Sequence, residues 1–293
     1  MKVAIYSRGV DRSQEAHCSQ LLQELRVHKS EFLIWEPLAN ALSKSNLLYG
    51  VQFEVFNSHE ALDENTDCLI SLGGDGTMLD TATLIREKNI PLLGINFGRL
   101  GFLATLGKEE LHNAVESLVG RTYLIDQRTL LHVDSDIALF EDAPFALNEL
   151  VLHKSENSSM IKIHCYINGE FLNTYWCDGL IVSTPTGSTG YNLSCGGPII
   201  FPDSASLAIT PIAPHHLNVR PIVVPDTDII SFEVESRNDK FICSVDARRE
   251  IVDTKTQVAV RKEAFTIGFM RLNENTFLET LRSKLTWGVD KRN

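Results

Sequence analysis

Hydrophobic positions divide the chain into a first part in which short apolar runs alternate with helical spacing, and a second part dominated by strand periodicity. Buried parallel strands read as continuous apolar runs, and their alternation with helices is typical of an α/β domain with a parallel sheet and flanking helices. In this first part the expected strands are Lys2–Tyr6, Val51–Phe56, Cys68–Leu72 and Pro91–Asn96, and the expected helices are Gln14–His28, Trp35–Lys44, a helix following Thr77, and Glu109–Leu118.

From about Tyr123 onward, apolar and polar residues alternate with a period of two. The run Ile161–Ile167 alternates in this way, and Asn168-Gly169 after it favours a tight hairpin turn into a partner strand at Phe171–Trp176. This alternation of apolar and polar residues predicts a mostly antiparallel β domain. Helical spacing returns near the end, where an amphipathic tail must cover its apolar face by packing on another part of the chain. We therefore divide the chain into 1–122 (α/β), 123–268 (β-rich) and 269–293 (tail).

Composition narrows the possible partners. The chain has 293 residues, is 43% hydrophobic and 22% charged, and has a net charge of −11. The negative charge argues against nucleic acid or an anionic membrane as the main partner. No apolar run reaches the length of a membrane helix, and the first residues do not resemble a signal peptide. Six cysteines without a CxxC pair suggest reduced thiols, so we expect a cytoplasmic protein.

A glycine-rich segment follows the apolar run Cys68–Leu72 and precedes a helical pattern. Gly73, Gly74, Asp75, Gly76 and Thr77 would therefore lie in a strand-to-helix turn, where glycine lets the backbone approach a ligand closely. The first turn of a helix offers unpaired N–H groups to phosphate. The spacing fits neither the dinucleotide fingerprint nor a Walker loop.

A carboxylate in a phosphate-binding turn needs its own explanation, because it would repel the anion. Asp75 could hold a metal, accept a proton or cap the turn. An ordinary capped turn explains an isolated Gly-Asp-Gly, but the longer Gly-Gly-Asp-Gly-Thr between a strand and a helix favours phosphate chemistry.

The second part contains a similar loop, Asp178–Pro198, that leaves an apolar strand. Serine, threonine and glycine dominate Ser183–Tyr191, which offers hydroxyls and backbone N–H groups for phosphate, ribose or amide recognition. A flexible surface loop is the alternative, although Pro185, Tyr191 and Leu193 look like packing anchors.

Other polar groups are less informative alone. Asn148-Glu149 precedes an apolar run, and Asp246 and Arg248 end a strand as an acid and a base. Each pair could be an ordinary surface feature. The histidines lack metal-ligand spacing, and the chain has no Gly-x-Ser-x-Gly elbow.

Taken together, these motifs resemble those of the bacterial-type NAD kinases over essentially the whole chain. The matching segments are Gly73–Thr77, Asn96–Leu103, Asn148-Glu149, Asp178–Pro198, His216–Pro221 and Asp246. The resemblance implies phosphorylation of the adenosine ribose 2′-hydroxyl of NAD to give NADP, with ATP (in some members polyphosphate) as donor. It also implies a divalent cation, Mg²⁺ or Mn²⁺, a homodimer or homotetramer, and a tail that returns to the α/β domain.

The resemblance also implies roles for single residues. Asp75 would be the general base, and no residue can be assigned as a direct metal ligand. Asn148 and Glu149 would hold ribose hydroxyls, and Asp178 the nicotinamide end. The full set implied to bind NAD or nucleotide is Gly73, Gly74, Asp75, Gly76, Thr77, Asn148, Glu149, Trp176, Asp178, Thr186, Thr189, Gly190, Tyr191, Asn192, Leu193, Ser194 and Arg248.

The sequence departs from the family pattern at several positions. Gly190 and Cys195 stand where other small residues are usual, Trp176 stands where a polar or basic residue is common, and Arg248 could reach a phosphate or fill part of the pocket. Two rivals remain open. A lipid kinase of the diacylglycerol or sphingosine type shares the glycine turn but would need an apolar cleft, and a non-catalytic nucleotide sensor would not need Asp75.

Overall fold

The computed structural model describes residues 1–155, 159–272 and 276–287, and the chain forms two compact units. The first unit comprises Met1–Gln127 and Ile267–Asn293, and the second comprises Arg128–Thr266. The chain passes between them within two long strands, β7 (Tyr123–Ser135) and β18 (Val258–Leu272). The tail expected at 269–293 includes 273–275 and 288–293, which lie outside the described residues.

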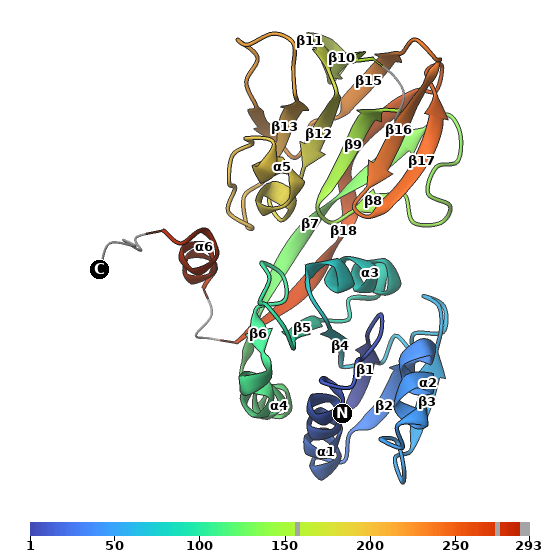
Figure 1. Ribbon diagram of the computed structural model, residues 1–293, viewed down its shortest axis with the longest axis vertical. Coiled ribbons are helices and arrows are strands. Elements are labelled where there is room, and N and C mark those ends of the chain that lie inside the picture. Colours follow the sequence, from blue (N-terminus) through green and yellow to red (C-terminus); the bar gives the residue numbers. More distant parts are fainter. Residues whose placement is uncertain (156–158, 273–275, 288–293) are drawn as a thin grey trace. The chain divides into compact units, whose positions relative to one another are not determined.

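The first unit is built on a parallel sheet with the strand order β5-β4-β1-β2-β3 (Figure 1). The short β6 pairs with β5 in parallel, and β18 joins the same strand through Phe269 and Leu92. Its elements are β1 (Lys2–Tyr6), α1 (Glu15–Val27), β2 (Glu31–Trp35), α2 (Glu36–Lys44), β3 (Phe53–Phe56), β4 (Cys68–Leu72), α3 (Asp75–Ile85), β5 (Leu92–Asn96), β6 (Leu106–Gly107), α4 (Leu111–Gly120) and α6 (Phe277–Leu285), with 3₁₀ turns at Arg86–Lys88 and Lys108–Glu110.

Helices cover both faces of this sheet. Apolar side chains of α1, α2 and α4 share one core with side chains of β1, β2, β4 and β5. Helix α3 packs its buried residues, including Met78 and Ala82, separately from that core. The fit between α3 and the sheet is close, because a Cβ on Gly94 of β5 would lie 2.6 Å from the Met78 sulfur. The predicted α/β class is confirmed.

Sequence periodicity missed one central strand. Glu31–Trp35 forms β2, which pairs with β1 and β3, so the strand expected second along the chain is the third. A five-residue apolar run cannot be assigned to strand or helix by periodicity alone. The helix expected to begin at Trp35 begins one residue later, with Pro37 in its first turn. The helix expected at Glu109–Leu118 lies at Leu111–Gly120.

The second unit contains two layers of mostly antiparallel strands. One sheet has the order β14-β13-β12-β9-β16-β17, and the other contains β11-β10-β15-β18, with β7 paired to β18 and β8. The new strands are β8 (Phe145–Ala146), β9 (Glu149–Lys154), β10 (Ile161–Ile167), β11 (Glu170–Cys177), β12 (Gly179–Ser183), β13 (Ser206–Ile212), β14 (Ile222–Pro225), β15 (Ile230–Glu235), β16 (Lys240–Val245) and β17 (Arg248–Asp253), and a short helix α5 spans Tyr191–Ser194. The predicted mostly antiparallel character is confirmed.

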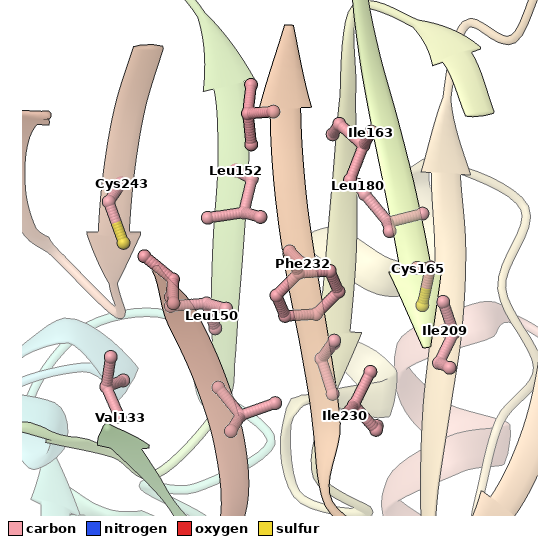
Figure 2. Packing of buried hydrophobic residues seen from close by; sticks show 14 of the residues in the cluster. Val133, Leu150, Leu152, Ile163, Cys165, Leu180, Ile209, Ile230, Phe232 and Cys243 are labelled. Carbon is pink, nitrogen blue, oxygen red and sulfur yellow. The ribbon is translucent and has the colours of Figure 1, made fainter. Parts of the chain in front are cut away.

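Alternating side chains of the two sheets meet in one core. Figure 2 shows Leu150, Leu152 and Leu180 of one sheet opposite Ile163 and Phe232 of the other. All of these side chains are buried. The hairpin predicted at Asn168-Gly169 joins β10 to β11, and both turn residues have positive φ, at 51° and 81°, as a type I′ turn requires.

All six cysteines are free thiols, and five of them are buried. Burial raises the pKa of Cys18, Cys68, Cys165, Cys177 and Cys243 to about 12. No helix among the described residues has the length and apolar character needed to cross a membrane.

Candidate active site

The glycine turn joins β4 to α3, as the sequence predicts. All five residues of β4 are buried, and α3 begins at Asp75. Gly73 has φ +155°, and a Cβ on it would lie 2.3 Å from the Thr77 hydroxyl oxygen. Any larger residue at position 73 would therefore displace the first turn of α3, whose N–H groups are the ones that suit phosphate.

The Asp75 carboxylate does not project freely from this turn. It accepts hydrogen bonds from the backbone N–H groups of Phe102 (2.8 Å), Leu103 (2.9 Å) and Ala104 (3.1 Å), in the segment that follows β5. A Cβ on Gly101 would lie only 1.7 Å from Asp75 Oδ1. The sequence left open that Asp75 caps its own turn. The carboxylate does bind backbone N–H groups, but these belong to the segment after β5.

Arg8 is a neighbour of the turn that sequence reasoning missed. It follows β1, and its guanidinium donates to the Gly76 carbonyl (3.0 Å) and forms a two-pronged ion pair with Asp80 on α3. β1 lies beside β4 in the parallel sheet, so the ends of both strands meet at one edge. The rule that ligands of such sheets gather at this edge could have pointed to Arg8.

Further positive charge acts on Asp75 from the same unit. The pKa of Lys284 on α6 is lowered by burial and then by the charge of Arg99, whereas the Asp75 carboxylate raises it. Arg99 is exposed, and its carbonyl accepts from the Asn96 amide at 2.7 Å. Arg8, which pairs with Asp80, thus contacts the glycine turn, and Lys284 lies within electrostatic reach of Asp75 and Arg99.

In the second unit, several polar side chains of the Asp178–Pro198 loop form hydrogen bonds that stabilise the loop itself. The Ser188 hydroxyl donates to Pro185 O (2.7 Å) and accepts from Ile200 N–H (2.9 Å). The Asn192 amide donates to Ser188 O and Pro198 O, and its oxygen accepts from the Thr210 hydroxyl at 2.6 Å. Since Asn192 is fully buried, a side-chain contact with nucleotide would require breaking these bonds.

Other residues of this loop reach the surface. Tyr191 is 41% exposed, Ser194 is exposed, and Thr189, Gly190 and Leu193 are partly exposed, whereas Thr186 is buried. A Cβ on Gly190 would lie 3.5 Å from Glu149 Oε2 and 3.6 Å from the Asn148 side-chain nitrogen. The loop therefore lies directly against the Asn148-Glu149 pair.

Asn148 and Glu149 lie at the start of β9, and each has a buried side-chain oxygen without a hydrogen-bond partner among the described residues. These oxygens are Asn148 Oδ1 and Glu149 Oε2. Burial, followed by the negative charge of Asp246, raises the pKa of Glu149 to about 8. A buried oxygen without a partner costs free energy of about 1–3 kcal/mol, so these two atoms are suited to a ligand with hydroxyl donors.

The remaining candidates have partners of their own. Asp178 forms an ion pair with Lys154 of β9 (2.7 Å), a residue that the sequence did not single out. The Trp176 ring stacks on His215 with centroids 4.5 Å apart. Arg248 donates to the carbonyls of Ala143 and Phe145. These contacts position the three side chains within the second unit.

The parallel sheet with its glycine turn and the antiparallel β unit with its polar loop define a class of protein, the phosphotransferases that act on nucleotides. The sequence family described as the ATP-NAD kinase N-terminal domain matches residues 11–123, and the ATP-NAD kinase C-terminal domain matches residues 147–271. The chain belongs to the NAD kinase family. It is an enzyme that phosphorylates NAD to NADP.

Relatives and solved structures agree with this assignment. The chain is 48% identical to NAD kinase of Cytophaga hutchinsonii and 43% identical to that of Flavobacterium psychrophilum, over 100% of each chain. Its fold is similar to an NAD kinase from Archaeoglobus fulgidus in complex with ATP, at 25% identity and TM-score 0.74, covering 98% of this chain and 99% of that one. It is also similar to yeast NADH kinase complexed with NADH, at 22% identity and TM-score 0.88, covering 100% and 89%. The lipid-kinase rival is thereby set aside.

Proposed function

We propose that ATP binds at the glycine turn, that NAD is held by the second unit, and that Asp75 removes the proton from the adenosine ribose 2′-hydroxyl as the terminal phosphoryl group arrives. The residues proposed to bind nucleotide are those that the family resemblance implies. The ATP complex of the Archaeoglobus NAD kinase supports ATP as donor, and the NADH complex of the yeast enzyme supports a dinucleotide acceptor.

The observation that carries the proposal is the pair of buried oxygens, Asn148 Oδ1 and Glu149 Oε2, that lack partners among the described residues. Ribose hydroxyls donate the hydrogen bonds that such oxygens require. Because the pKa of Glu149 is about 8, its carboxyl is mostly protonated at neutral pH and can donate as well as accept. A diol is both a donor and an acceptor, so the pair matches a sugar better than it matches a phosphate.

Asp75 would act as the base while its carboxylate is hydrogen-bonded to the backbone N–H groups of Phe102, Leu103 and Ala104. Among the described residues, Oδ2 accepts only the Phe102 N–H, so it keeps a lone pair that can accept the substrate proton while the three N–H bonds keep the group oriented. Such orientation is what general-base catalysis requires. The N–H groups of the first turn of α3, with Arg8 beside them, would receive the donor phosphates.

A divalent cation is proposed to enter as part of the nucleotide substrate. The described residues contain no group of three or more His, Cys, Asp or Glu side chains arranged to hold a metal ion. Mg²⁺ or Mn²⁺ bound to the phosphates of ATP would neutralise their charge.

Two further proposals concern the whole molecule. We infer a cytoplasmic enzyme from the free, mostly buried cysteines, and a homodimer or homotetramer from the family resemblance. Sedimentation of the purified protein would test the second, and a monomer at micromolar concentration with full activity would contradict it.

The test of function is direct. Purified protein is incubated with NAD, ATP and Mg²⁺, and the products are separated by chromatography, with NADP expected. Omitting Mg²⁺, replacing ATP with polyphosphate and replacing NAD with NADH resolve the cation, the donor and the acceptor. Absence of NADP under all conditions would overturn the proposal.

A further inference from the structure

The tight turn between β16 and β17 contains an aspartate in a strained backbone conformation. Val245 pairs with Arg248, so Asp246 and Ala247 form the whole turn. Asp246 has φ +53°, in the left-handed region that disfavours residues with a Cβ and that aspartate tolerates better than most. Strained residues of this kind persist where surrounding contacts hold them, and here the contacts are made by the carboxylate.

The Asp246 carboxylate binds three consecutive backbone N–H groups. Oδ2 accepts from Leu147 (2.9 Å), and Oδ1 accepts from Asn148 (2.8 Å) and Glu149 (3.3 Å). In return, the Asp246 N–H donates to the Glu149 carbonyl at 3.1 Å. Hydrogen bonds to a charged acceptor are stronger than neutral ones, so one side chain fastens the whole segment 147–149.

The fastened segment is the one whose side chains lack partners. The Asn148 carbonyl accepts from Thr184 N–H at 2.9 Å, and a Cβ on Gly187 would lie 2.2 Å from that carbonyl oxygen. The segment is thus held between Asp246 on one side and the 184–190 loop on the other. Asn148 Oδ1 and Glu149 Oε2, both buried and unpaired among the described residues, are held in place by this arrangement.

Asp246 also acts on Glu149 electrostatically. Burial is the main cause of the raised pKa of Glu149, and the charge of Asp246 adds to it. Burial raises the pKa of Asp246 as well, while its N–H donors and the Arg248 guanidinium lower it. Tyr191 and Cys195 also lie within electrostatic reach of Glu149. The three N–H donors and the Arg248 guanidinium favour the charged form of Asp246.

We propose that Asp246 is a positioning residue for NAD binding: it fixes the backbone of Asn148 and Glu149 so that their free oxygens meet the ribose hydroxyls. This inference rests on the proposed function, in which Asn148 and Glu149 bind NAD. In this role Asp246 acts through the two residues that it holds.

The test compares Asp246→Asn with the wild-type enzyme. An asparagine turns one acceptor oxygen into a donor that faces the N–H groups of 147–149. Loss of such a bond raises KM for NAD by about 10- to 100-fold, with kcat much less affected. The variant also removes a negative charge beside Glu149, so the limb of the pH profile of kcat/KM that reports Glu149 moves to lower pH. A residue that served only the fold would not move that limb.

Asp253→Asn is the matched control. Asp253 is the last residue of β17 and is exposed, and its carboxylate accepts a local hydrogen bond from Lys255 N–H at 2.9 Å. The control is expected to leave KM for NAD and the pH profile unchanged. Asp246→Asn with a wild-type KM and an unmoved limb overturns the inference. If NADP forms in the wild type and Asn148→Ala raises KM while Asp246→Asn does not, the positioning role fails and the proposed function stands.

A measurement without mutation covers the case in which Asp246→Asn does not fold. Amide hydrogen exchange of the full-length wild-type enzyme reports on the N–H groups of Leu147, Asn148 and Glu149 directly. Protection comparable to that of the β9 ladder, already present without NAD, is expected. Rapid exchange of these three amides without NAD, with protection only after NAD is added, would show that the substrate and not Asp246 fixes the segment.

Discussion

The Asp75 carboxylate occupies the space in which a side chain on Gly101 would stand. A Cβ on Gly101 would lie 1.7 Å from Asp75 Oδ1 and 2.4 Å from the carboxyl carbon. Gly101 does not have a positive φ, so its backbone conformation does not require glycine. Glycine is needed there because a side chain would collide with the Asp75 carboxylate.

This relationship predicts the effect of Gly101→Ala. The added methyl group has to push the carboxylate away from the Phe102–Ala104 N–H groups, and overpacking of this kind costs about 1–3 kcal/mol. We expect kcat to fall by about 10²-fold or more, approaching the loss of a general base. Gly98→Ala is the control, because its Cβ would make an ordinary 3.5 Å contact with Asn96. Equal kcat values for both variants would contradict the prediction.

Replacing the base itself isolates its chemistry from its packing. Asp75→Asn keeps the shape but cannot accept the proton, so kcat should fall by about 10²–10⁴-fold with little change in KM for NAD. The amide nitrogen would face one N–H donor of the Phe102–Ala104 segment, which lowers the free energy of unfolding by about 1–3 kcal/mol. Thermal unfolding and steady-state kinetics measure the two effects separately. Asp67→Asn, at the other end of β4, is the control, and turnover by Asp75→Asn near the wild-type rate would remove Asp75 from catalysis.

Asn148→Ala removes one of the two unpaired oxygens. We expect KM for NAD to rise by about tenfold, because one hydrogen bond to the ribose is lost, while KM for ATP stays unchanged. The exposed Asn113 on α4 provides a control through Asn113→Ala. An unchanged KM for NAD in Asn148→Ala would exclude this side chain from the binding site.

The raised pKa of Glu149 predicts a pH-dependent stability. Its pKa is about 8 in the folded state and near 4.5 in the unfolded state, so between these values the folded protein binds the extra proton. Below about pH 4.5 Glu149 is protonated in both states and does not lower the free energy of unfolding. As the pH rises towards 8, its ionisation in the unfolded state lowers the free energy of unfolding by up to about 1.4 kcal/mol per pH unit. Glu149→Gln cannot ionise, so its stability relative to wild type should increase over this range.

Urea unfolding at pH 5, 6.5 and 8 checks this prediction. Glu170→Gln, an exposed site at the start of β11, makes the same chemical change without burial and should follow the wild-type curve. Parallel curves for wild type and Glu149→Gln would show that Glu149 titrates as an ordinary surface acid.

The sequence predicts the glycine turn well because strand, turn and helix are contiguous. The apolar run before Gly73–Thr77 and the helical spacing after it are enough to place this segment in a strand-to-helix turn. The hydrogen bonds to the Asp75 carboxylate could not be predicted in this way, because their N–H donors lie 27 to 29 residues further along the chain and have no side-chain signature. For the same reason Asn148-Glu149 is uninformative alone, since Asp246 reaches it only through the pairing of β9 with β16.

Residue type alone does not distinguish the roles of the polar side chains in the loop Asp178–Pro198. The sequence offers the hydroxyls of this loop to a ligand, and the family resemblance adds Asn192, but Ser188 and Asn192 are buried and form hydrogen bonds within the loop. Composition cannot separate a hydroxyl that faces a ligand from one that holds a turn, because both uses favour the same small polar residues. Only the path of the chain between β12 and β13 distinguishes them.

The internal bonding of this loop has a thermodynamic consequence. Ser188 and Asn192 order the segment during folding, so the conformational entropy of its backbone is lost before any substrate arrives. If NAD binds at this loop as proposed, it meets a preorganised surface, and more of its contact energy remains available as affinity. Loosening Asn192 would therefore weaken binding, because the entropy of ordering this loop would then be lost on binding.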